Sequence, residues 1–158
     1  MYFTQLSKDS RVWVYQSNRS FSENEKMLLN ESFKEFVSSW AAHGSKLVAD
    51  AIVIEDFFVA LAVDEKTAMA SGCSIDSSVK FIKSVGQQLN IDFFNRLKLV
   101  VKKDSETKMI SFSDLNQYND WKIYNTLVNT VEKLNTSFLI PVVKSELYKM
   151  LIFFLILK

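Results

Sequence analysis

Cys73, the only cysteine of the chain, lies where the sequence predicts the start of a helix. Ser74 is a preferred N-cap residue, and Asp76 would follow in the first turn, where the helix dipole favours a negative charge. The free N–H groups of a helix start favour a thiolate, which is a nucleophile, whereas a neighbouring carboxylate disfavours it. Because a lone cysteine more often packs as a small apolar side chain, packing is the alternative interpretation of Cys73.

His43, the single histidine, is the other residue suited to this chemistry. It would lie in the last turn of the first predicted helix, which the pattern ends at Gly44. Beside Cys73 it would act as a base, with Asp76 or Asp64 orienting its ring. The end of one helix can meet the start of the next when the two pack antiparallel, although the sequence does not establish that contact. One hypothesis is therefore a thiol-dependent enzyme or redox-responsive protein with Cys73, His43 and Asp76 as its catalytic residues.

Hydrophobic spacing predicts the elements that would position these side chains. Strands are expected over 11–15, 47–54, 57–63, 97–101 and 108–112, and helices over 22–44 and 74–90. Ser22 and Glu25 have the spacing of a capping box at the start of the first helix. The first six elements match the βαββαβ order called ferredoxin-like, an α+β fold in which two helices cover one face of an antiparallel sheet. A C-terminal extension would follow, with Pro141 in an edge strand or loop and Ser145 capping a last helix.

Composition excludes several classes of function. The 158 residues, 48% of them hydrophobic, fit a single domain over 1–158. Lys and Arg total 19 against 18 for Asp and Glu, so bulk charge does not favour a nucleic-acid partner. One cysteine and one histidine leave no zinc cluster, and we expect no metal or other cofactor. The N-terminal segment lacks the pattern of a secretory signal, so a cytoplasmic location is expected.

The most apolar run of the chain covers residues 150–157. It is too short for a membrane span, which needs about 20 apolar residues. An exposed run of this kind would form a patch that soluble monomers rarely carry. We therefore expect it to be ordered, either on the protein's own core or across the interface of a homo-oligomer.

Four segments of the chain resemble a family of short uncharacterised bacterial proteins often labelled "ABC transporter ATPase". These segments are RVWVYQSNR (11–19), WAAHG (40–44), AVDE (62–65) and SGCSID (71–76). The resemblance spans roughly residues 1–148, and the ending after residue 150 differs from the family's polar or aromatic ending. The label implies ATP hydrolysis, which in P-loop proteins uses the motif G-x-x-x-x-G-K-[ST]. Gly44, Gly72 and Gly86 cannot supply that motif, so the chain is not expected to be a P-loop ATPase.

A non-enzymatic binding or protein-interaction domain is the leading hypothesis, because no complete set of catalytic residues is evident. Its partner would be another protein or a second copy of the chain. The candidate binding residues all lie in the four segments named above, and they are Trp13, Asp64, Ser71, Gly72 and Ser74.

Overall fold

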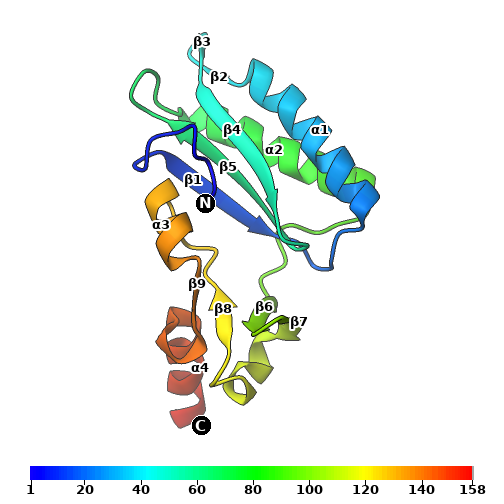
Figure 1. Ribbon diagram of the computed structural model, residues 1–158, viewed down its shortest axis with the longest axis vertical. Helices are drawn as coiled ribbons and strands as arrows, with labels where there is room; N and C mark the ends of the chain where they lie inside the picture. The colour runs from blue at the N-terminus through cyan, green and yellow to red at the C-terminus, as the bar shows by residue number, and fades with distance from the viewer. Residues whose placement is uncertain (158) are drawn as a thin grey trace.

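In the computed structural model, which describes residues 1–157, the longer strands form two antiparallel sheets (Figure 1). The first sheet has the order β1–β5–β4, with strands Arg11–Gln16, Phe58–Asp64 and Val48–Ile54. The second has the order β7–β6–β8–β9, with strands Glu106–Ser111, Lys98–Lys103, Lys122–Tyr124 and Leu139–Pro141. A small hairpin joins β2 (Ala41–Ala42) to β3 (Ser45–Lys46).

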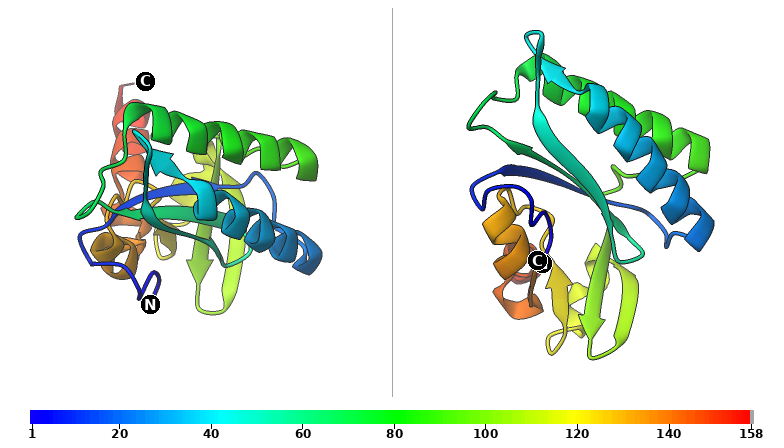
Figure 2. Two further views of the ribbon diagram at one scale, coloured as in Figure 1. Left: turned by 90° about the horizontal axis from the view of Figure 1, so that it is seen from above. Right: turned by 45° about the horizontal axis from the view of Figure 1, so that its top comes forward.

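Helices lie on both faces of the first sheet. The long helices α1 (Glu23–Ser39) and α2 (Gly72–Leu89) pack side by side on one face, and the short α3 (Val131–Ser137) lies toward the other (Figures 1 and 2). The second sheet is packed against η1 (Phe112–Gln117), η2 (Val142–Lys144) and α4 (Glu146–Ile156). The α+β class with antiparallel sheets is thus confirmed.

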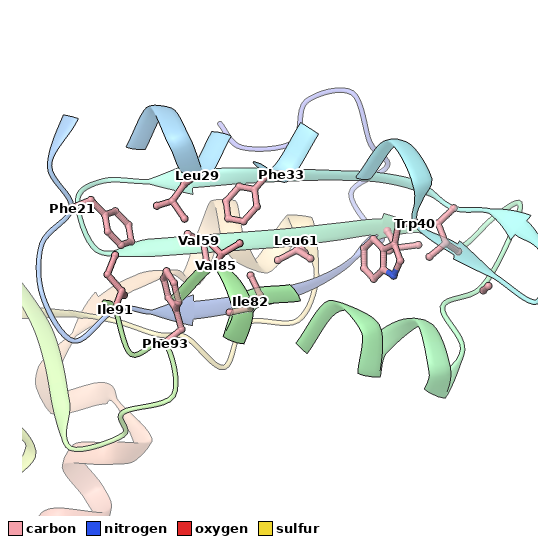
Figure 3. Packing of buried hydrophobic residues seen from close by; sticks show 13 residues of the cluster. Phe21, Leu29, Phe33, Trp40, Val59, Leu61, Ile82, Val85, Ile91 and Phe93 are labelled. Carbon is pink, nitrogen blue, oxygen red and sulfur yellow. The ribbon is translucent and has the colours of Figure 1, made fainter. Parts of the chain in front are cut away.

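The core of the first sheet is centred on β5, in which every residue from Phe58 to Val63 is fully buried. Figure 3 shows Leu29 and Phe33 of α1 and Ile82 of α2 packed over this strand. Alternate β5 residues turn to the opposite face, where they meet a second apolar cluster. Burial on both faces explains why the strand is continuously apolar, since neither face meets water.

The ferredoxin-like topology is not confirmed. The first five predicted elements follow it, and they are β1, α1, β4, β5 and α2. In that topology the strand after α2 would lie beside β1. Here β6 pairs with β7 and β8 in the second sheet instead. Both faces of β6 are apolar, with Val100 in one cluster and Leu99 and Val101 in another, so its hydrophobic pattern predicts a strand without selecting a sheet. The adjacent β7 pairs with one edge of β6 in a local hairpin, and β8 occupies the other edge, where β1 would otherwise pair.

Helix ends differ from the prediction at two places. The helix α1 begins where its Ser22–Glu25 capping box predicts, but it ends at Ser39 rather than at Gly44. His43 and Gly44 have positive φ values of 52° and 78° and form the two-residue turn between β2 and β3, as type I′ hairpin turns require.

The second difference is at the start of α2. Its N-cap is Ser71 rather than the predicted Ser74, so the helix begins at Gly72, three residues earlier than expected.

The apolar C-terminal run forms the helix α4, capped by Ser145 as predicted. Leu151 is buried against the second sheet. The residues from Phe153 to Leu157 are exposed, so the alternative that this run packs on the protein's own core is wrong for them. Among the helices of residues 1–157, none combines the length and the apolarity that crossing a membrane requires.

Candidate functional site

Cys73 lies in the first turn of α2 and is exposed, so the interpretation of this cysteine as a buried packing residue is wrong. The neighbouring hydroxyl groups form a capping box. The Ser74 N–H donates to Ser71 Oγ at 3.1 Å, and the Ser71 N–H donates to Ser74 Oγ at 2.7 Å. Gly72 is exposed and has no atom close to where a Cβ would lie. Ser71 and Ser74 therefore serve the start of the helix, and they are not aimed at a ligand.

The ends of the two long helices do meet, as antiparallel packing allows. The Trp40 indole Nε1, just past α1, donates to the Ser74 carbonyl in the first turn of α2 at 2.9 Å. His43, however, lies exposed at the tip of the β2–β3 hairpin. In the part of the chain that the structure describes, no hydrogen bond joins His43 to Cys73. The exposed carboxylate of Asp76 instead pairs with Lys80 at 3.0 Å along α2.

Asp64 stabilises the turn that follows β5. Its carboxylate accepts hydrogen bonds from the backbone N–H of Lys66 at 3.1 Å and of Ser7 at 3.3 Å. The Lys66 N–H is the main cause of the lowered pKa of Asp64, because donors to a carboxylate favour its charged form. Both oxygens are thus occupied by backbone donors, which leaves the predicted ring-orienting role without support.

Trp13 is the predicted binding residue that lines a cavity. It is half-buried on β1, its ring meets that of Trp40 edge-on with centroids 6.1 Å apart, and the Arg11 guanidinium lies 4.8 Å from its centroid. Beside it is a cleft of about 600 Å³. The cleft is lined by Asp9, Glu65, residues 11–15 of β1 and residues 126–130.

The floor of this cleft is the free edge of β1, because the first sheet ends there. The Val12 N–H points away from β5 and donates to the Asn129 carbonyl at 3.0 Å. Backbone groups alternate sides along an antiparallel strand, so the N–H and C=O of Val14 point outward too. Within residues 1–157 neither group of Val14 has a hydrogen-bond partner. Farther along, the edge is closed by Gln16, whose Nε2 donates to the Lys98 carbonyl at 2.8 Å.

The cleft around the open edge has a mixed lining, in which half of the residues are apolar or aromatic and half are polar or charged. Trp13 and Tyr15 project toward the helix face of the sheet, and burial raises the pKa of the Tyr15 hydroxyl. Leu127 on the opposite wall is 72% exposed. The charges at the rim, Arg11 and Glu65, lie 3.8 Å apart. This arrangement offers main-chain hydrogen bonds beside apolar contacts, which is the chemistry that an extended polypeptide requires.

Sequence reasoning identified Trp13 but not the cleft. The alternating pattern of 11–15 predicts a half-buried strand without showing that one of its edges is open. Residues 126–130, which build the second wall, carry no motif. The exposure of Leu127 in that segment is visible only in the structure, and single exposed leucines are common on protein surfaces.

No family model, curated protein or solved structure matches the chain. Within residues 1–157, no three His, Cys, Asp or Glu side chains are grouped as a metal site would require.

Proposed function

We propose that this protein is a non-enzymatic protein-interaction domain that binds an extended polypeptide segment along the free edge of β1. The observation that carries the proposal is the pair of unpartnered backbone groups of Val14 at the floor of a cleft of about 600 Å³. A bound strand would form its main-chain hydrogen bonds there, while its side chains contact Trp13, Tyr15 and Leu127.

The arrangement of the first sheet supports this mode of binding. In a ferredoxin-like sheet a fourth strand would cover β1, whereas here β6 lies in the second sheet. The edge is accessible only between two closures, the Val12–Asn129 and Gln16–Lys98 hydrogen bonds. Such a short opening admits a ligand strand but limits uncontrolled pairing with other edges. We assign no ATP hydrolysis to the chain, and we propose that it belongs to the family of short bacterial proteins that its four segments resemble.

A single backbone substitution tests the proposal. Val14→Pro removes the outward N–H without breaking any hydrogen bond of the protein, because proline is tolerated on an edge strand whose N–H faces away from the sheet. Peptides selected from a displayed random library on the wild-type protein would be the probes. We expect Val14→Pro to weaken their binding by at least about tenfold, while Val14→Thr, which keeps the N–H and a β-branched side chain, binds normally.

Two outcomes would contradict this assignment. One is unchanged peptide affinity in a folded Val14→Pro variant, with folding checked by circular dichroism. The other is a library selection that yields no peptide whose binding shifts the Val14 amide signal in an NMR titration.

The alternative, a thiol-dependent enzyme or redox-responsive protein, rests on the exposure of Cys73 in the first turn of α2. A fast reaction of the folded protein with iodoacetamide at neutral pH, compared with a small model thiol, would support it. A rate no faster than that of the model thiol would contradict a reactive role for Cys73.

A further inference from the structure

The helix α4 carries a large apolar face that nothing in residues 1–157 covers. Five residues of the helix and Leu157, which follows it, are between 44% and 77% exposed. They are Met150, Phe153, Phe154, Leu155, Ile156 and Leu157. By helical spacing Met150, Phe153, Phe154 and Leu157 share one side of the helix and Ile156 flanks it, whereas Leu155 continues the stripe of Leu151. Figure 1 shows α4 at the end of the molecule away from α1 and α2.

The opposite side of α4 is anchored to the protein. Leu151 is buried there, and Leu147 and Tyr148 pack with it against the apolar cluster of the second sheet. This contact fixes which face of the helix points outward. The exposed Met150, Phe153 and Leu157 recur at intervals of three and four residues, the spacing of a seam between two packed helices.

The size of the face is that of half an interface. A fully exposed aromatic side chain offers about 150–250 Å², so Phe153 and Phe154 at their exposures, together with the smaller Met150, Ile156 and Leu157, leave several hundred Å² of apolar surface. This reaches or exceeds the largest apolar patch of a typical monomer, about 300–600 Å². Two such faces in contact approach the roughly 1,200–2,000 Å² that a specific protein interface buries.

The charges of α4 favour a second copy over a lipid surface. The helix has two charged residues, Glu146 and Lys149, and they pair with each other at 2.7 Å. The helix therefore carries no net charge to attract anionic lipid headgroups, as interfacial helices usually do. A face that is uniformly apolar with a neutralised ion pair at one end is complementary to itself, which a twofold-symmetric interface requires.

We propose that two copies of this chain associate through α4, face to face about a twofold axis, with Phe153 and Phe154 at the centre. The interface is separate from the free edge of β1, so this inference does not depend on the proposed peptide binding. Because α1 and α2 lie at the other end of the molecule, the pairing leaves them uncovered (Figure 1).

Light scattering coupled to gel filtration, at a series of micromolar concentrations, tests the pairing. We expect the wild-type protein to approach twice the 18.2 kDa mass of the chain as concentration rises. The double variant Phe153→Glu/Phe154→Glu should remain a monomer throughout, because association would bury four carboxylates in an apolar interface. The matched control is Met27→Glu, at a 63% exposed position on α1, which should dimerise like the wild type.

A second variant controls for possible misfolding of the double variant. Ile156→Glu changes a 77% exposed residue near the end of α4 and should also lower the dimer fraction, with an unchanged circular dichroism spectrum. A wild-type protein that stays monomeric, or a folded double variant that still dimerises, would overturn the proposal. Flotation of a monomeric wild type with phosphatidylcholine vesicles would overturn it as well and would assign the face to a membrane surface.

Discussion

The central strand of the first sheet and the helix on the second sheet bury their apolar residues to very different extents. In the first, every β5 residue from Phe58 to Val63 is fully buried, because helices and loops cover both faces. In the second, α4 packs one side on the sheet, while the outward residues from Phe153 to Leu157 are at least 44% exposed. Equally apolar sequence thus forms a closed core in one region and an uncovered surface in the other.

The difference follows from what each region has available to cover it. The first sheet packs against two helices of 17 and 18 residues, whose aromatic side chains interlock, as in the stacked Phe36 and Phe81 rings 4.3 Å apart. Two of the four strands in the second sheet, β8 and β9, have three residues each. Apolar surface that a region cannot bury by itself is available to a partner, and this distinguishes a core from an interface.

The largest expected effect comes from truncating one phenylalanine in each region. Phe33, on the side of α1 that faces the sheet, is 1% exposed, and Phe33→Ala should cost about 3–5 kcal/mol through lost burial and a cavity. Phe153→Ala, at a 60% exposed site, should leave the stability of the monomer within about 0.5 kcal/mol of the wild type. Urea unfolding at a protein concentration low enough to dissociate any dimer measures both. Similar losses in the two variants would show that α4 is covered within the monomer.

Gly86 tests how tightly the first region is closed. A Cβ at this position would lie 2.5 Å from the Ile91 carbonyl oxygen, in the backbone that follows α2. Gly86→Ala should therefore destabilise the protein by about 1–3 kcal/mol, despite the better helix propensity of alanine. Gly72→Ala is the matched control, because no atom lies within 4 Å of its added methyl group. Thermal unfolding of the two variants separates them, and an equal melting temperature would contradict the close approach.

Acid should weaken the first region through Glu25. The pKa of this carboxyl is lowered from 4.5 to about 2, first by hydrogen bonds from Arg19 and then by the Ser22 backbone N–H. A lowered folded-state pKa adds stability above the unfolded value, and this stability is lost as pH falls from about 4.5 toward about 2. Glu25→Gln should cost a few tenths to about 1 kcal/mol near neutral pH and less at pH near 3. Urea unfolding at both pH values, with Glu31→Gln as control, would reject this role if the Glu25→Gln loss did not shrink in acid.

The smallest effect is expected at Tyr124, where the two regions meet. Its ring lies 4.7 Å from that of Phe58, and its buried hydroxyl has no hydrogen-bond partner within residues 1–157. Burial, and then the Glu55 carboxylate, raise the pKa of this hydroxyl. Because an unsatisfied buried polar group is costly, Tyr124→Phe should leave stability unchanged or raise it by up to about 1 kcal/mol. A clear loss in urea unfolding would indicate that the hydroxyl is hydrogen-bonded, to the nearby Glu55 carboxylate or to a bound water.

Local sequence determined the elements of this protein well. The Ser22–Glu25 capping box marks the start of α1, and the apolar runs on either side of residues 55 and 56 mark the paired strands β4 and β5. These features depend on neighbours within one helical turn or one strand, so a single sequence displays them. The exposed His43 turn was missed because helix periodicity continues to Trp40, and the positive φ values that follow have no unique residue signature.

Tertiary structure alone decided where those elements lie and what they leave open. One edge of β6 forms a hairpin with β7, and its other edge pairs with β8 rather than with β1, although the apolar pattern of β6 suits either partner. The cleft beside Val14 exists because residues 126–130, more than 100 positions away, cover only part of the β1 edge. The outward face of α4 is apolar in sequence like a core segment, and it is exposed because no other element within residues 1–157 packs on it. A hydrophobic pattern shows which side chains must be covered, whereas contacts between residues distant in sequence determine which surface covers them.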